Sequence, residues 1–188
     1  MSSNDPCTTA AIQWSETDRL SHLHDLQILD TAPEAAYDDL VRIATLVIGA
    51  PIALVSLVDE TRQWFKARIG LDETETSRDV SVCAHAIETE SILVIPDLTQ
   101  DARTKANPLV TGSHAFRFYA GAVIRTSAGL PLGSLCILDI RPRPEGLTEI
   151  QIEVLCALAR QVASLIATRR VRTEVAAQEV ELAASERR

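Results

Sequence analysis

The sequence predicts an α+β domain in which helices cover an antiparallel sheet. Two helical patterns come first, short β-branched stretches grouped as hairpins follow, and one long helical pattern runs to the end of the chain. Strands that are grouped between helices, without strand–helix alternation, are typical of this class. With 188 residues, 46% of them hydrophobic, the chain is long enough for one domain with a proper core and some additional helix.

The N-terminal part is expected to contain a disordered tail and then a helix. Residues 1–13 are polar and show no periodic pattern. Over residues 15–30, leucines recur at helical spacing. Ser15 is the expected N-cap, and Asp18 follows three residues later, where a carboxylate stabilises a helix start.

A second helix is predicted over residues 31–49. Thr31 and Glu34 have the spacing of a capping box, and Pro33 is expected in the first turn. Gly49 is a suitable C-terminal stop.

The middle of the chain has the short apolar stretches of β-strands. The stretches "PIALVSLVD" and "RQWFKARIG" are joined by a tight polar turn, so a hairpin is the simplest interpretation. A further strand is predicted in "ILVIPDLT". A second hairpin is predicted from "FYAGAVIRT" and "PLGSLCILDIRP", and a long, turn-rich polar segment separates it from the first.

A single helix is predicted from Leu147 to the end of the chain. Its 3-4-3-4 spacing is carried by Leu155, Leu158, Val162, Leu165 and Arg169. About 40 residues at about 1.5 Å each reach about 60 Å, which is longer than the domain from which the helix starts. The end of this helix is either frayed or part of a parallel coiled coil, and the coiled coil is the favoured interpretation. The predicted domain therefore spans residues 14–167, and residues 168–188 form its helical extension.

Composition argues against several classes of protein. The net charge of −8 and the lack of a basic stripe disfavour a nucleic-acid surface. No apolar run reaches membrane-spanning length without interruption, and the N-terminus does not resemble a signal peptide, so a cytoplasmic protein is expected. The four cysteines are scattered without a CxxC pair, which disfavours a disulfide framework and a zinc ribbon.

Six blocks in order resemble a bacterial GAF domain over residues 19–167, of the branch found N-terminal in sensor histidine kinases and diguanylate cyclases. These blocks are "RLSHLHDLQILDTAPEAAYDDLVRIA", "PIALVSLVDETRQWFKARIGL", "SVCAHAI", "VIPDLTQDARTKANPLVTG", "RFYAGAVI" and "GLPLGSLCILDIRPR". The resemblance implies a six-stranded antiparallel sheet covered by helices on both sides. It also implies a small-molecule pocket under residues 80–119 and terminal helices that dimerise and carry a signal.

The segment "SVCAHAI" raises the question of metal or thiol chemistry. If Ser81 caps a short helix, Cys83 and His85 point about 200° apart and cannot converge on one ion. Zinc needs three or four ligands, and Cys136 and His114 are candidates only by elimination. The favoured interpretation is a buried Cys83 with His85 at the edge of a pocket.

An alternative is thiol catalysis at Cys83. GAF-fold enzymes that reduce free methionine sulfoxide have a cysteine on a segment similar to this one, but the other cysteines expected in such an enzyme are missing near "NPLVTGSHAFRFYAG". Cys136 lies instead on a predicted core strand. Covalent bilin attachment prefers adjacent Cys and His residues, whereas Ala84 separates Cys83 from His85 here. Haem binding through His85 or His114 has no support in the sequence. The motif of cyclic-nucleotide-binding GAF domains does not appear. The cofactor is therefore left unknown.

A non-covalent pocket is the remaining interpretation. Aromatic walls with an arginine and an imidazole suit a small anionic or planar ligand. The predicted ligand-binding residues are Trp64, Phe65, Cys83, His85, Asp97, Asn107, Arg117 and Tyr119. Trp64 and Phe65 alternate along a strand and should face opposite sides, and either can be core. Arg117 can instead pair with Asp97 or Asp101.

The function predicted from the sequence is a sensory GAF module that is not an enzyme. It binds a small molecule, dimerises through its terminal helices, or does both, and it signals to a histidine kinase or diguanylate cyclase output in cis or in trans. The alternatives are a cysteine-based redox enzyme or sensor that uses Cys83 and a purely structural dimeriser. No nucleic-acid or membrane partner is expected.

Overall fold

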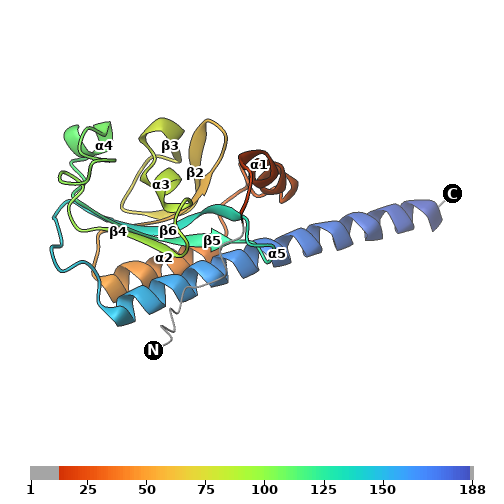
Figure 1. Ribbon diagram of the computed structural model, residues 1–188. Coiled ribbons are helices and arrows are strands. Elements are labelled where there is room, and N and C mark those ends of the chain that lie inside the picture. Colours follow the sequence, from red (N-terminus) through yellow and green to blue (C-terminus); the bar gives the residue numbers. More distant parts are fainter. Residues whose placement is uncertain (1–12, 187–188) are drawn as a thin grey trace, which may run out of the picture.

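The computed structural model describes residues 13–186 and has one six-stranded antiparallel sheet between two helical layers (Figure 1). The strand order is β3-β2-β1-β6-β5-β4. The helices are α1 (Glu16–Asp25), α2 (Ala35–Ile48), a 3₁₀ turn η1 (Arg78–Val80), α3 (Val82–Ala86), α4 (Pro108–Thr111) and α5 (Glu149–Glu186). The strands are β1 (Ile52–Val58), β2 (Arg62–Ile69), β3 (Glu75–Ser77), β4 (Ile92–Ile95), β5 (Phe118–Arg125) and β6 (Pro131–Asp139).

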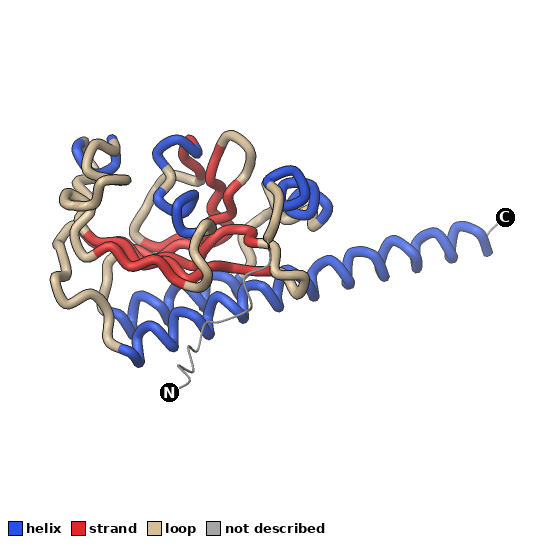
Figure 2. Tube along the Cα trace, viewed as in Figure 1, coloured by secondary structure: helices blue, strands red, loops and turns tan. Residues whose placement is uncertain are grey.

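The sheet has a separate hydrophobic core on each face. Helices α2 and α5 lie side by side under one face, and α3 and α4, with the loops around them, lie over the other (Figure 2). Strands β1 and β6 are buried along their whole length because both faces of the sheet are covered. The predicted α+β class and the six-stranded antiparallel sheet are confirmed.

Both predicted hairpins are present, as β1–β2 and β5–β6. The register places Leu54 opposite Cys136 and Ser56 opposite Ser134 on the central pair β1–β6. The short edge strand β3 was not predicted. It has three residues, all polar and none fully buried, so it carries no hydrophobic pattern to detect.

The helix caps confirm two predictions and correct two. Pro33, which was expected in the first turn, lies before the N-cap, because α2 begins at Ala35. The side chain of Ser15 accepts a hydrogen bond from the Asp18 amide, and Gly49 ends α2 with a φ of 67°. The predicted capping box of Thr31 and Glu34 is wrong, because Glu34 is the N-cap of α2 but makes no side-chain cap bond. Its carboxylate instead accepts a 2.7 Å hydrogen bond from Lys66, whose buried ammonium requires an anionic partner.

Helix α5 packs against the sheet with its first half and projects beyond the domain with its second (Figure 1). Its 38 residues give a length of about 57 Å. By length and composition the stretch Glu149–Arg172 is suited to crossing a membrane, contrary to the expectation that no such run exists. In this structure, however, Leu155 and Val162 of that stretch are buried in the core of the domain. Residues 1–12 of the predicted disordered tail lie outside the described residues.

Candidate functional site

A row of polar side chains crosses the otherwise apolar core between the sheet and α3. We call it the polar cluster, and its members are Ser56, Gln63, Ser81, Cys83, Tyr119, Ser134 and Cys136. All seven are buried. Buried polar groups cost free energy unless they are hydrogen-bonded, so a connected set of this size marks a specialised part of the core.

Two thiols meet at the centre of the polar cluster. Ser81 is the N-cap of α3 and accepts a hydrogen bond from the Ala84 amide, which places Cys83 in the first turn, facing the sheet. The Sγ atom of Cys83 lies 3.7 Å from the Sγ atom of Cys136 on β6. Both thiols are free, whereas Cys156 is disulfide-bonded, which the scattered cysteines did not predict.

Tyr119 of β5 connects the thiols to the sheet. Its hydroxyl donates to the Sγ atom of Cys83 at 3.4 Å and lies 3.1 Å from the Ser134 hydroxyl. A Cβ atom on Gly121, two residues along the same strand, would overlap this hydroxyl. Gly121 therefore leaves the space in which the tyrosine lies along the strand and reaches Cys83.

Gln63 of β2 fixes the start of α3. Its side-chain oxygen accepts hydrogen bonds from the hydroxyls of Ser56 at 3.2 Å and Ser81 at 2.6 Å. Its side-chain nitrogen donates to Thr76 of β3 at 2.6 Å. One glutamine thus joins three strands to the N-cap of α3. Sequence reasoning missed it, because a lone glutamine in a strand pattern gives no sign of which face it occupies.

The two thiols have different acidities. The hydrogen bond with Cys136 is the largest influence on the pKa of the Cys83 thiol and lowers it. Burial raises this pKa, and hydrogen bonds with Ser134, Ser56 and Tyr119 lower it further. The same contact and burial raise the pKa of Cys136 well above its usual value. Cys83 is therefore the more acidic thiol and the better nucleophile of the pair.

Four further predicted site residues lie outside the polar cluster, His85 on α3 and Asp97, Asn107 and Arg117 between β4 and β5. His85 is half-buried on α3. Asn107 caps α4 by accepting from the Leu109 amide, and its side-chain nitrogen donates to the Val80 carbonyl at 2.9 Å. Asn107 therefore joins the α4 segment to the segment that leads into α3, which is a structural role.

Arg117 is held by main-chain oxygens. It donates to the carbonyl groups of Val110 at 3.0 Å and Phe116 at 2.9 Å. Asp97 accepts hydrogen bonds from the hydroxyl and the amide of Thr99 instead, and these are the main cause that lowers the pKa of its carboxyl. The charge of Arg117 lowers this pKa further. The alternative partner of Arg117 is also occupied, because Asp101 pairs with Arg103 at 2.6 Å.

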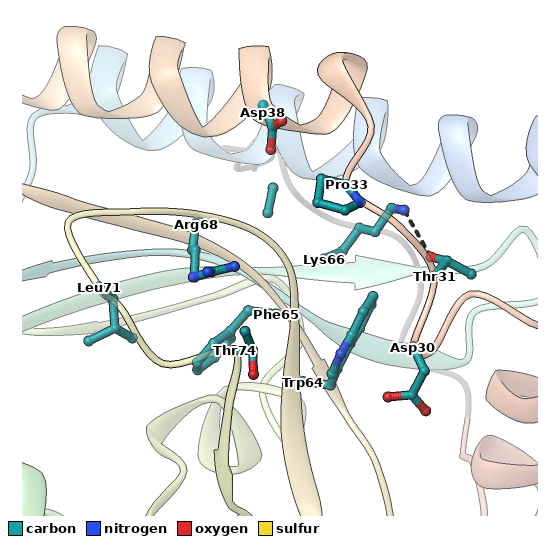
Figure 3. A pocket seen from close by; sticks show the side chains of 11 residues that line it. Asp30, Thr31, Pro33, Asp38, Trp64, Phe65, Lys66, Arg68, Leu71 and Thr74 are labelled. Carbon is teal, nitrogen blue, oxygen red and sulfur yellow. Dashed lines mark hydrogen bonds between the residues drawn. The ribbon is translucent and has the colours of Figure 1, made fainter.

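Trp64 and Phe65 do lie on opposite sides of the sheet, Trp64 in the core with α2 and α5 and Phe65 in the core with α3. Both border a groove of about 630 Å³ beside β2, shown in Figure 3. The groove is lined by Asp30, Thr31, Pro33, Asp38, Trp64, Phe65, Lys66, Ala67, Arg68, Leu71 and Thr74. The predicted ligand-binding residues are thus divided among this groove, the polar cluster, α3 with His85, and the segments between β4 and β5.

Two tyrosines offer a matched test of the polar cluster. Tyr119→Phe is expected to lower the free energy of unfolding by about 1 kcal/mol, because it removes the hydroxyl that serves Cys83 and Ser134. The control is Tyr37→Phe, because the buried Tyr37 hydroxyl has no hydrogen-bond partner among the residues that the structure describes. That change is expected to be neutral or stabilising. Urea unfolding of both variants measures the difference, and equal losses would contradict the role given to Tyr119.

Comparison with known proteins gives a consistent family assignment. The model of a family described as GAF domain matches residues 32–166. A cyclic di-GMP phosphodiesterase of Pseudomonas aeruginosa is 40% identical over 155 residues, which cover 82% of this chain and 26% of that protein. The chain therefore spans about a quarter of the length of this curated relative.

Solved structures show the same fold at lower identity. The GAF domain of a phosphoenolpyruvate-protein phosphotransferase from Coxiella burnetii has a TM-score of 0.62 at 18% identity, covering 85% of this chain and 99% of that one. A type II free methionine-R-sulfoxide reductase from Thermoplasma acidophilum has a TM-score of 0.54 at 14% identity, covering 70% and 92%. At these identities the likeness is one of fold.

Proposed function

Since the chain belongs to the GAF domain family, we propose that it is a cytoplasmic regulatory module, not an enzyme, which forms a homodimer and transmits a signal through α5. The observation that carries this proposal is a second seam on α5, whose members are exposed or half-buried. Its members recur with strict 4-3 spacing and are Ile150, Val154, Ala157, Gln161, Ser164, Thr168, Val171 and Val175. Such a seam is the pattern by which two helices pair in a coiled coil.

The seam has apolar members at both ends. Ile150 at the start is 71% exposed, and Val171 and Val175 near the other end are 58% and 47% exposed. Helix α2, which packs against α5, also exposes large apolar side chains, with Leu46 at 75%. A second copy that pairs along α5 would remove these surfaces from water, which supports a dimer over a monomer.

The output domain that this module would regulate is proposed from the matching phosphodiesterase. The phosphodiesterase of Pseudomonas aeruginosa is about four times as long as the matched part, so further domains accompany this fold in that protein. We infer that this chain regulates an output of the same general kind, one that makes or degrades cyclic di-GMP, in cis or in trans. A histidine kinase is the second candidate output, from the sequence resemblance.

The face of the sheet on which the resemblance implies a ligand pocket is closely packed in its centre. Val82, Cys83 and Tyr119 are buried there, at 5%, 3% and 1% exposure. Dimerisation is therefore the part of the proposed function that the geometry supports best. A small ligand would bind at the periphery of this face, where His85 and Arg117 are half-buried.

Sedimentation velocity tests the dimer. The chain is expected to sediment as a dimer, and the double variant Val171→Glu, Val175→Glu is expected to weaken the association at least about tenfold, because it places four carboxylates in the pairing seam. Ile140→Glu is the matched control, since Ile140 is exposed but lies outside α5. A monomeric parent protein at high concentration would contradict the proposal.

Turnover assays test the regulatory assignment. The isolated chain is expected neither to hydrolyse cyclic di-GMP nor to reduce free methionine sulfoxide. In particular, the 3% exposure of Cys83 prevents a substrate of amino-acid size from reaching its sulfur. Turnover of methionine sulfoxide that is lost in Cys83→Ser would establish the enzyme alternative instead.

A further inference from the structure

We propose that Cys83 and Cys136 form a reversible disulfide when the protein meets a hydroperoxide, which ties α3 covalently to the central strand β6. The two residues are 53 positions apart in the sequence and come from different layers of the fold. Their contact is therefore made by the tertiary structure. It unites a helix of five residues with a strand that is hydrogen-bonded on both sides.

The geometry requires a small movement of one partner. The sulfur atoms are 3.7 Å apart, whereas a disulfide needs about 2.05 Å. Strand β6 is held between β1 and β5, so it cannot approach without breaking sheet hydrogen bonds. The short helix α3 is hydrogen-bonded to the sheet at its N-cap, where Ser81 bonds to Gln63, and the rest of it is held by side-chain packing, which can adjust. We expect α3 to move toward the sheet while its cap stays in place.

The environment of Cys83 favours its role as the attacking thiolate. The Tyr119 hydroxyl donates to its sulfur, and the neighbouring thiol of Cys136 can donate when Cys83 is ionised. These donors stabilise negative charge on the buried sulfur of Cys83. Cys136 sits where it can attack the oxidised Cys83 in a second step.

The reaction balances in two steps. The Cys83 thiolate attacks one oxygen of the hydroperoxide, the O–O bond breaks, Cys83 becomes a sulfenic acid, and the leaving alkoxide or hydroxide takes a proton. The Cys136 sulfur then attacks the Cys83 sulfur, the S–S bond forms, and the sulfenic hydroxyl leaves as water with the Cys136 proton. Overall, two thiols and one hydroperoxide give a disulfide, an alcohol or water, and a water. A dithiol reductant reverses the oxidation.

Burial selects a small oxidant. Cys83 and Cys136 are 3% and 0% exposed, and the half-buried Ala84 and His85 lie on the outer side of α3. Hydrogen peroxide is close to water in size, so the ordinary opening of a five-residue helix admits it. Larger oxidised substrates are excluded, and the pair therefore acts as a sensor of peroxide.

The disulfide would also affect α5, and this consequence rests on the proposed function. Leu135 and Ile137 flank Cys136 on β6 and point to the opposite face, into the core that α5 shares. A change in the stiffness of β6 at Cys136 is therefore transmitted to the packing of α5. Formation of the disulfide itself does not depend on the dimer.

Peptide mapping by mass spectrometry tests the proposal. The protein is treated with hydrogen peroxide, quenched in acid, denatured, alkylated and digested with a protease that cleaves after glutamate. Glutamates 145, 149 and 153 separate Cys136 from Cys156, whereas trypsin is less suitable because Arg141 and Arg143 both precede proline. We expect a cross-linked pair of peptides that contain Cys83 and Cys136, which disappears after reduction. Two alkylated cysteines after peroxide treatment would overturn the proposal.

Single variants separate the two steps. In Cys136→Ser, Cys83 is expected to stop at the sulfenic acid. Dimedone added together with denaturant traps this acid, because the folded protein excludes a reagent of this size from the 3% exposed Cys83. In Cys83→Ser, Cys136 is expected to give no adduct. A dimedone adduct on Cys136 with none on Cys83 would overturn the assignment of the attacking thiol. If a variant does not fold, the peptide map of the parent protein still shows whether the disulfide between Cys83 and Cys136 forms. Because the map is independent of oligomeric state, a monomer with this cross-link would refute the dimer alone.

Discussion

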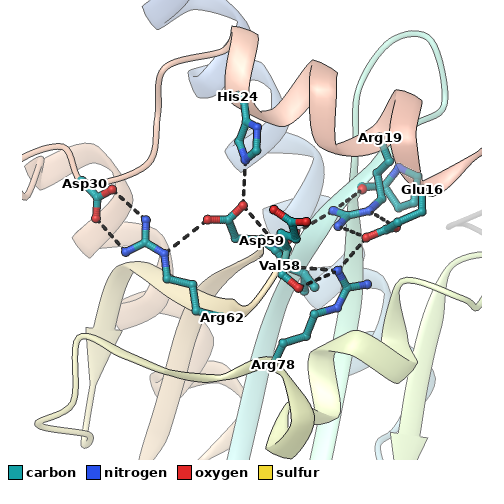
Figure 4. Close-up of polar contacts among 10 residues, drawn as sticks. Glu16, Arg19, His24, Asp30, Val58, Asp59, Arg62 and Arg78 are labelled. Carbon is teal, nitrogen blue, oxygen red and sulfur yellow. Dashed lines mark hydrogen bonds and ion pairs between the residues drawn. The ribbon is translucent and has the colours of Figure 1, made fainter.

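Glu16→Ala is expected to cost about 3 kcal/mol of unfolding free energy, although Glu16 lies in the first turn of a surface helix. Its carboxylate binds both Arg19, at 2.7 and 2.8 Å, and Arg78, at 2.6 Å (Figure 4). Arg19 is 0% exposed, and its guanidinium also donates to the Val58 carbonyl at 2.7 Å. Removing Glu16 leaves this buried cation without its anion, which is the costly way to break an ion pair. The loss lies at the lower end of the range for buried pairs because Glu16 is itself 41% exposed.

Arg19→Met is the informative control. It removes the buried charge but keeps most of the aliphatic volume, and it leaves Glu16 partly exposed and still paired with Arg78. The remaining costs are a cavity and the lost donor to Val58, so we expect a smaller loss than for Glu16→Ala. Urea unfolding at neutral pH compares the two variants. A larger loss for Arg19→Met would show that the packing of Arg19 matters more than its charge.

The ion pair also predicts how stability depends on pH. The hydrogen bond from Arg19 is the largest cause that lowers the pKa of Glu16, from its usual 4.5 to about 2. A lowered folded-state pKa contributes stability that is complete above 4.5 and is lost as the pH falls toward 2. The difference in unfolding free energy between the parent protein and Glu16→Gln should therefore shrink over this range. A difference that stays constant from pH 6 to pH 2 would contradict the assignment.

The sequence predicted the fold well because each element has a local signal. Apolar periodicity located α2 and α5, β-branched runs located the hairpins, and Ser15 and Gly49 marked the correct ends of helices. The incorrect capping box shows the limit of such signals. Glu34 has the right spacing for a cap, but Lys66 is close in space and distant in sequence, and its need for an anion is stronger than that of the helix terminus.

The candidate site was predicted less completely than the fold. "SVCAHAI" indicated Cys83, and Tyr119 was chosen as a pocket residue, but nothing in the sequence places Cys136 against Cys83. That contact depends on the register of β6 against β1 and on how α3 crosses the sheet. Asn107 shows the converse case, since its position at the head of a loop suggested a ligand contact and the structure gives it a capping role.

Gly133→Ala is expected to cost more than about 3 kcal/mol, and it tests the strand pair that carries Cys136. Gly133 lies on β6 opposite Leu57 of β1, in the middle of the sheet. A Cβ atom there would overlap the Ser56 carbonyl oxygen and lie 2.8 Å from the Cα atom of Leu57. Both neighbours are main-chain atoms of a central strand, so neither can rotate away as a side chain would.

Two other glycines calibrate this expectation. A Cβ atom at Gly49 would meet no atom within 4 Å in the described part of the chain, and only the φ of 67° strains it. Gly49→Ala is therefore expected to cost about 1 kcal/mol. Gly121→Ala meets the Tyr119 side chain instead of main chain, so its effect should centre on Cys83 and appear as slower peroxide cross-linking. Thermal unfolding ranks Gly133→Ala as the least stable of the three. A small loss for Gly133→Ala would mean that β1 and β6 can separate locally, and the premise that α3, not β6, moves to form the disulfide would then be wrong.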